Sequence, residues 1–272
     1  MDEGRYEAAV REMMDNRVFL DDDERRAFGE VVRQGVPDSL RAQFWNLCTG
    51  INMYKNGYCD EYYRTLHQSI QSGELERYPN QMFEKYRRDI SRAFPNDNFY
   101  TDAIKEPIAR IIEAYIWRNP TVGYIQGFNF LVFRLRKVLD EEDTFWTLVM
   151  IIETYMPPDY YVEMYGVRTQ ASILQKIFRQ YSFLPEVQAK FDDPKIMFNL
   201  MDNAISWFIS LYTECLPEKA SLQVLDLFFL FGQKNNKVIF DVALGYLKTL
   251  QDQIVVADDL GVLKNEVFTE EN

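Results

Sequence analysis

The chain has 272 residues, of which 47% are hydrophobic and 15% aromatic, which is enough for a large core and too much for a disordered chain. Its 30 Lys and Arg against 42 Asp and Glu give a net charge of −12. Because no basic run is present either, the composition argues against nucleic acid or an anionic membrane as a partner and suits a partner with a basic surface.

Few residues could support metal binding or covalent catalysis. The cysteines are Cys48, Cys59 and Cys215, no two of which have C-x-x-C spacing, and the only histidine is His67. We therefore expect no metal site, no bound cofactor and no Ser-His or Cys-His catalysis. Phosphate-loop, dinucleotide-binding and metalloprotease motifs are missing. The start of the chain lacks a signal sequence and no apolar run spans a bilayer, so a soluble cytosolic protein without membrane insertion is expected.

Apolar residues recur at helical spacing along most of the chain. In the first half, the pattern predicts helices over 5–14, 21–35, 40–50, 62–73, 79–94, 104–119 and 128–139. In the second half, it predicts helices over 140–155, 173–181, 205–212, 224–231 and 238–247. Strand alternation with hairpin dipeptides is nearly absent, which indicates an all-α fold of many short-to-medium helices.

The helical pattern runs without a fixed-period repeat or a low-complexity linker. We expect a flanking extension over residues 1–20, one main domain over 21–250, and an acidic segment over 251–272 that forms a short helix or a tail. A break near residues 157–170 could separate two helical subdomains. Monomer is the default state.

Two segments carry polar residues with no evident structural task. Asp89 and Arg92 are three residues apart, hence on one helix face, and Arg92 stands at the end of its helix. The turn over 121–129 presents one uncharged polar side chain, Gln126, between Gly123 and Gly127. Each segment also has a structural interpretation: an ion pair at a helix C-terminus for the first, and a buried amide joining two helices for the second.

Together with other motifs, these segments resemble the TBC domain of Rab GTPase-activating proteins. The matching motifs, in chain order, are Gly35-Val36-Pro37-x-x-Leu40-Arg41-x-x-Phe44-Trp45; Asp89-x-x-Arg92-x-Phe94-Pro95; Asn119-Pro120-x-Val122-Gly123-Tyr124-x-Gln126-Gly127-x-Asn129; Asp140-Glu141-Glu142-Asp143-x-Phe145-Trp146; Met156-Pro157-Pro158-x-Tyr160-Tyr161; Ser206-Trp207-Phe208 with Leu216-Pro217; and Leu225-Asp226-Leu227-Phe228. The chain departs from the family pattern at Tyr86, Ala93 and Leu225, which we expect to be core or supporting positions.

The resemblance implies that the chain accelerates GTP hydrolysis by a Rab-family GTPase in its GTP form. Arg92 would be the arginine supplied in trans to the transition state, and Gln126 the glutamine that positions the attacking water. GTP and Mg²⁺ would belong to the partner. A catalytically silent scaffold that binds a small GTPase, and an unrelated helical adaptor, are the alternatives.

The resemblance also implies supporting roles around these two residues. Asp89 would orient Arg92, and Arg41 would brace the same site or contact the Rab. Tyr124 and Asn129 would hold the shape of the turn, and Gly127 would let its backbone approach the partner. Trp45 and Trp207 are expected to pack in the core.

Overall fold

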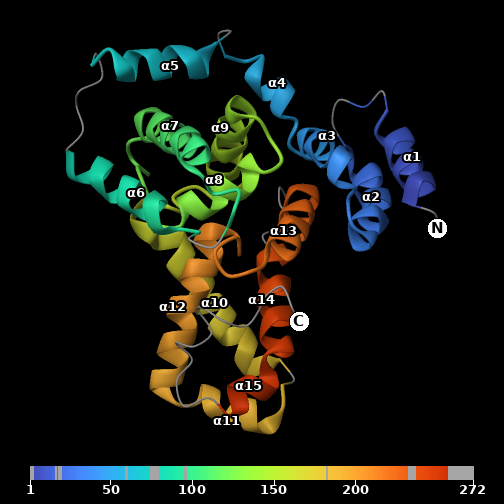
Figure 1. The fold of residues 1–272 in the computed structure, drawn as a ribbon. Coiled ribbons are helices and arrows are strands. Elements are labelled where there is room, and N and C mark those ends of the chain that lie inside the picture. The colour runs from blue at the N-terminus through green and yellow to red at the C-terminus, as the bar shows by residue number, and fades with distance from the viewer. Residues whose placement is uncertain are drawn as a thin grey trace.

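The computed structural model describes residues 3–15, 17, 20–58, 61–73, 80–94, 97–181, 183–231 and 237–256. Within these residues every regular element is a helix, so the predicted all-α class is confirmed (Figure 1). Several predicted features lie outside the described residues: the helix start at Pro79, the stops at Pro95 and Gly232, Cys59 and residues 257–272.

The helices up to the central turn correspond to the predicted ones with one addition, α4. They are α1 (Glu3–Met14), α2 (Asp22–Gln34), α3 (Asp38–Thr49), α4 (Ile51–Lys55), α5 (Tyr62–Gln71), α6 (Asn80–Arg92) and α7 (Asp102–Arg118). The start of α2 shows why the sequence predicts its bounds. Asp21 caps the helix and Glu24 closes a capping box, which satisfies the first backbone N–H groups.

After the turn, each predicted helix is present. The helices are α8 (Phe128–Arg136), α9 (Glu141–Met150), the π-helix η1 (Ile151–Tyr155), the 3₁₀-helix η2 (Val162–Met164), α10 (Tyr165–Gln180), α11 (Pro185–Phe191), α12 (Pro194–Ser210), α13 (Glu218–Phe231), α14 (Lys237–Thr249) and α15 (Gln251–Val256). Helices α10 and α12 begin eight and eleven residues before the predicted starts at 173 and 205, and η2, α11 and α15 are additional. The predicted helix over 140–155 is thus an α-helix that widens into a π turn before Pro157.

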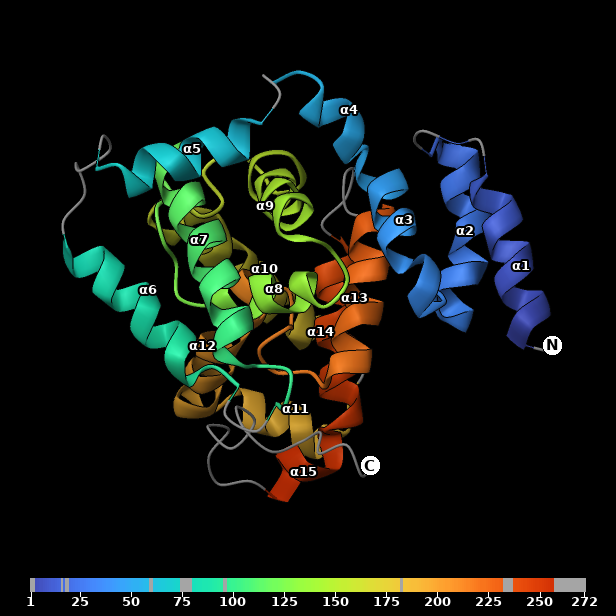
Figure 2. The same ribbon diagram turned by 45° about the horizontal axis from the view of Figure 1, so that its top comes forward.

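The helices form two groups joined by α13. Figures 1 and 2 show α4–α9 together on one side of the molecule and α10, α11, α12, α14 and α15 forming a column beneath them. The connection between the groups runs through residues 156–164, which overlap the predicted break near 157–170. Helix α13 lies between α12 and α14 in sequence and packs against α14 of the column as well as against α2, α3 and α8, so its apolar face ties the two groups into one core.

A buried carboxylate fixes α13 to α3. Asp226 is fully buried and accepts hydrogen bonds from the indole Nε1 of Trp45 at 2.7 Å and from Arg41 Nε at 3.2 Å. Arg41 also donates to the carbonyl of Val36 at 2.8 Å and forms an ion pair with the exposed Asp38. Burial raises the pKa of Asp226 to about 6, while Arg41 and Trp45 act in the opposite direction.

Side chains also satisfy the carbonyl groups at the ends of α3 and α13. Arg25 donates to the carbonyl of Cys48 at 2.8 Å and to that of Leu230 at 2.6 Å. The Tyr155 hydroxyl lies 3.1 Å from the carbonyls of both Cys48 and Phe229. These carbonyls come from the last turns of their helices, where no intrahelical donor remains.

Replacing Asp226 by Ala should destabilise the fold by about 3–5 kcal/mol, because the buried guanidinium of Arg41 and the indole N–H of Trp45 lose their acceptor. Asp38→Ala is the matched control: it removes the other carboxylate on Arg41, which is 91% exposed, and should cost less than about 1 kcal/mol. Urea unfolding followed by circular dichroism measures both. Equal losses of unfolding free energy for the two variants would contradict the role of Asp226 as the buried acceptor for Arg41 and Trp45.

The raised pKa of Asp226 makes a distinct contribution to the pH dependence of stability. Since the native carboxyl binds its proton more tightly than the unfolded one (about 6 against 3.8), this contribution is fully present below pH 4 and is lost as pH rises to about 6. The loss amounts to about 3 kcal/mol. The unfolding free energy of wild type minus that of Asp226→Asn should therefore fall as pH rises from 4 to 7; a constant difference would contradict this.

Candidate functional site

Arg92 and Asp89 form an ion pair at the C-terminal end of α6. Arg92 Nη2 donates to Asp89 Oδ1 at 2.5 Å. The two partners differ in burial, because the Asp89 side chain is 6% exposed and the Arg92 side chain 63%. A guanidinium has five N–H donors. With one contact holding the group to Asp89, an exposed set of donors is left for a partner molecule.

The same carboxylate is tied to the central turn. The Tyr124 hydroxyl donates to Asp89 Oδ2 at 3.0 Å. Burial, reinforced by the negative charge of Asp89, raises the pKa of Tyr124 above its ordinary value, so the hydroxyl keeps its proton and acts as donor. Asn129, also buried, donates from Nδ2 to the backbone carbonyl of Asp89 at 3.4 Å. Asp89 therefore connects α6 to both sides of the turn.

Gln126 stands at the corner of this turn with an exposed side chain. Phe128 N donates to the carbonyl of Ile125 at 3.1 Å, which closes a β-turn with Gln126 and Gly127 as its central residues. The φ of +114° at Gly127 is the positive value that the third position of a type II turn demands. Asn129 Oδ1 accepts from Gly127 N at 3.3 Å and braces the corner.

Packing inside the molecule gives a second reason for a glycine at position 127. A Cβ on Gly127 would lie 2.8 Å from Cγ2 of Ile209 in α12, too close for any side chain. The absence of a side chain thus lets the turn pack on α12. The predicted reason for a glycine at this position is different: close approach of the turn's backbone to a partner. Behind the turn, Tyr161 stacks edge-on to Phe128 at 5.2 Å and its hydroxyl donates to the carbonyl of Ile209 at 3.4 Å.

The structure does not bring Arg41 to these residues. Its hydrogen bonds go to Asp38, Val36 and Asp226, which lie on α3, on the segment before α3 and on α13. It lines a polar surface groove of about 1000 Å³ between α1, that segment and α13. Of the predicted site residues, Asp89, Arg92, Tyr124, Gly127 and Asn129 are joined by hydrogen bonds, Gln126 lies in the same turn, and Arg41 is the exception.

An aromatic cluster holds the end of α6 in place. Phe94 packs on Phe133 with ring centroids 4.3 Å apart, and the Tyr100 hydroxyl donates to the carbonyl of Ile90 at 2.5 Å. Ile90 lies in the last turn of α6, so this bond anchors the backbone that carries Arg92. Nothing in the sequence singles out Tyr100, although its position just beyond Phe94 and Pro95 places it close to the helix end.

The departures from the family pattern lie in the interior, as expected. Tyr86 and Leu225 are fully buried, and Ala93 is half-buried. The Tyr86 ring packs edge-on to Tyr124 at 5.9 Å, so it supports the side chain that holds Asp89. Trp45 and Trp207 are both buried, which confirms their expected place in the core.

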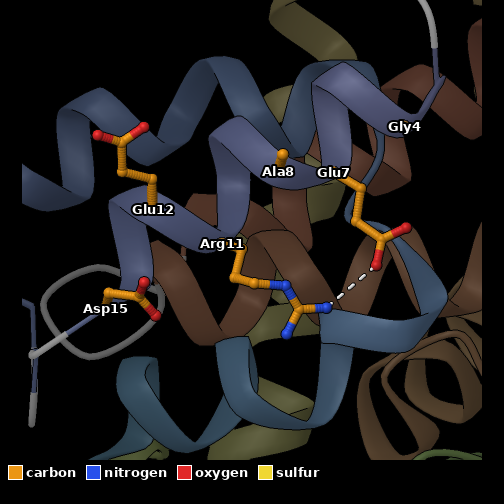
Figure 3. Close-up of a pocket in the computed structure, with 6 residues that line it drawn as sticks. All are labelled: Gly4, Glu7, Ala8, Arg11, Glu12 and Asp15. Carbon is orange, nitrogen blue, oxygen red and sulfur yellow. Dashed lines mark hydrogen bonds and ion pairs between the residues drawn. The ribbon is translucent and has the colours of Figure 1, made fainter.

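Other surface features carry little chemistry. Figure 3 shows a shallow hollow along α1, lined by Gly4, Glu7, Ala8, Arg11, Glu12 and Asp15, in which Arg11 pairs with Glu7. Among the described residues, no group of three His, Cys, Asp or Glu side chains could hold a metal ion. None of the described helices is long and apolar enough to cross a membrane.

Comparison with known proteins places these residues in a family context. The sequence model of the RabGAP-TBC family, the Rab-GTPase-TBC domain, matches residues 38–255. The chain is 30% identical to TBC1 domain family member 2B of Xenopus tropicalis over 86% of its own length and 24% of the relative's. It is 32% identical to Growth hormone-regulated TBC protein 1-A of Danio rerio, covering 84% of this chain and 62% of that one. The chain thus spans about a quarter of the member 2B relative.

Solved structures agree with the fold. The Chlamydomonas flagellar RabGAP TBC domain superposes with a TM-score of 0.73 at 27% identity, covering 90% of this chain and 78% of that one. The Ypt/Rab-GAP domain of Gyp1p superposes with a TM-score of 0.77 over 98% of this chain and 93% of that one, and at 16% identity this likeness concerns the fold alone. Since the family model covers most of the sequence, the chain belongs to the RabGAP-TBC family.

Proposed function

We propose that this chain accelerates GTP hydrolysis by a Rab-family GTPase and supplies Arg92 and Gln126 in trans. One observation carries the proposal. The exposed Arg92 is oriented by the buried Asp89, which is itself bonded to Tyr124 in the turn that presents the exposed Gln126. One buried hydrogen-bond network thus supports two exposed polar side chains that come from separate elements. An ion pair at a helix end would require no such connection to the turn.

Arg92 would act on the charge that develops during phosphoryl transfer. Negative charge builds on the phosphoryl and leaving oxygens in the transition state, and a planar guanidinium offers them charged donors in a fixed fork. An arginine supplied in this way is worth about 10³–10⁵ in rate, or about 4–7 kcal/mol. The Asp89 contact would hold the side chain near the required orientation before the partner arrives, which lowers the entropy lost on docking.

Gln126 would act on the attacking water. A primary amide can accept a hydrogen bond from water through its oxygen and donate to a phosphate oxygen through its nitrogen. The β-turn places this side chain at an exposed corner whose backbone is fixed by Asn129. Orientation of a poorly ordered nucleophile is a large part of catalysis in this class of reaction.

The remaining groups would support these two or belong to the partner. Asp89 would remain a positioning residue, because a carboxylate beside a triphosphate is repelled. GTP and Mg²⁺ would be bound by the GTPase. The chain would act in the cytoplasm, brought to endomembranes by its partners.

Arg92→Ala and Arg92→Lys should each reduce the acceleration of GTP hydrolysis by at least about 10³-fold, because lysine lacks the planar fork. Phosphate release from a panel of GTP-loaded Rabs measures this, with wild type alongside. The melting temperature should fall only slightly, since Asp89 keeps its bond to Tyr124; the loss of one charged hydrogen bond is worth about 1.5–3 kcal/mol at most.

The result separates the alternatives. Nucleotide-dependent binding without acceleration by well-folded wild type would favour the silent scaffold, and no GTP-dependent binding to any Rab would favour an unrelated adaptor. An Arg92→Lys variant with full activity would refute the arginine role while leaving the activity itself established.

Gln126→Ala should also lose most of the acceleration, even with a Rab that keeps its own glutamine, because the water would no longer be held by an amide from this chain. As an exposed position with no hydrogen bond to a described residue, Gln126 should tolerate the change with unaltered unfolding free energy. Thr121→Ala, an exposed change in the same turn, is the matched control and should retain activity. Full activity of Gln126→Ala on such a Rab would remove this residue from the mechanism.

A further inference from the structure

Helix α6 carries more positive charge than the proposed mechanism uses. Between Asn80 and Arg92 it has four Lys or Arg and two Asp or Glu, a net charge of +2 (4 − 2) in a chain whose net charge is −12. Lys85, Arg88 and Arg92 are spaced i, i+3 and i+7, so they share one face of the helix. All three are exposed. We call Lys85 and Arg88 the cationic face of α6.

The cationic face differs from many of the charged positions on other helices. Several cations there pair with an acidic residue three or four positions away, as Figure 3 shows for Arg11 and Glu7, whereas others, such as Lys176 and Lys248, form no salt bridge among the described residues. The other pairs of this kind are Arg26–Asp23, Arg33–Glu30, Arg64–Glu61, Lys105–Asp102 and Lys237–Asp241.

On α6 the arrangement is different. Glu84 lies four residues before Arg88, yet among the described residues neither Lys85 nor Arg88 forms a salt bridge. The remaining arginine, Arg87, is also exposed, but its guanidinium lies 5.8 Å from the centre of the Tyr86 ring, so it has a contact within the chain. Lys85 and Arg88 are three residues apart and Arg88 and Arg92 four, and like charges at these spacings disfavour a helix.

Distance along the helix indicates what the cationic face can reach. At 1.5 Å per residue, Arg88 lies about 6 Å and Lys85 about 10 Å behind Arg92. If Arg92 meets the phosphoryl group of the partner's GTP, Lys85 lies too far back to share it. The groups opposite Lys85 and Arg88 would then be protein side chains bordering the nucleotide.

We propose that Lys85 and Arg88 dock carboxylates on the GTPase surface beside its nucleotide site, and so orient the partner on Arg92. This inference rests on the proposed function. In a chain whose net charge is −12, a cationic face beside Arg92 would favour an orientation that brings an acidic part of the partner to α6 during encounter. Rim charges of this kind act on association and its salt dependence more than on the bound complex.

The test is the kinetics of Lys85→Glu/Arg88→Glu on a Rab that wild type accelerates. KM should rise about 10-fold or more at low salt while kcat stays within about twofold, and the salt dependence of kcat/KM should flatten. Lys176→Glu/Lys248→Glu is the matched control. Both control residues are exposed, have no salt bridge among the described residues, and take the net charge from −12 to −16 as the test pair does. Its KM should stay within about twofold of wild type.

Each outcome has a separate meaning. If wild type accelerates no GTPase, the proposed function fails and this inference with it. If wild type is active but the two double variants have equal KM, the docking role is refuted and the function stands. A fall in kcat instead of a rise in KM would overturn the carboxylate assignment in favour of phosphate contact. Unchanged KM with lost binding to phosphatidylserine vesicles would overturn it in favour of a membrane surface.

Discussion

The position of the candidate site depends on the carboxylate of Asp89, buried where α6 ends. One of its oxygens accepts from Arg92 and the other from Tyr124, while its backbone carbonyl accepts from Asn129. A buried carboxylate is stable only when such donors surround it. Arg92 lies on the same helix, so the bonds that hold the end of α6 against the central turn are those from Tyr124 and Asn129.

The elements behind the turn limit how far it can move. The φ of +114° at Gly127 and the 2.8 Å approach that a Cβ there would make to Ile209 mean that the corner and α12 share their space. Tyr161, from the connection between the two helical groups, packs on Phe128 and bonds to Ile209. The backbone that carries the exposed residues of the turn is thus packed against α12 on its other side. Such a backbone is suited to presenting side chains at fixed positions to another protein.

Local signals in the sequence were sufficient for most helices and insufficient for the pairings between them. The start of α2 is predictable because Asp21 and Glu24 act within one turn, whereas α4 and α11 are too short to display a helical period. The pairing of Arg41 with Asp226 joins residues 185 positions apart, and no local pattern reveals it. The resemblance implies that Arg41 braces the site or contacts the Rab. In the structure, Arg41 joins α3 to α13. Gly127 was identified from its neighbours, but its contact with α12 could not be.

The carbonyl contacts at the ends of α3 and α13 bear on how the molecule opens. Terminal turns usually fray one helix at a time, since each has its own unsatisfied carbonyls. Here Arg25 serves the last turns of both helices, and Tyr155 reaches the same two ends from the π-helix. Loss of either helix end leaves donors of Arg25 and Tyr155 without an acceptor, so α2, α3, α13 and the π-helix should exchange their amide hydrogens as one cooperative unit. Figure 1 shows α2, α3 and α13 on the other side of the molecule from α6, so this cooperative unit is separate from the helix that carries Arg92.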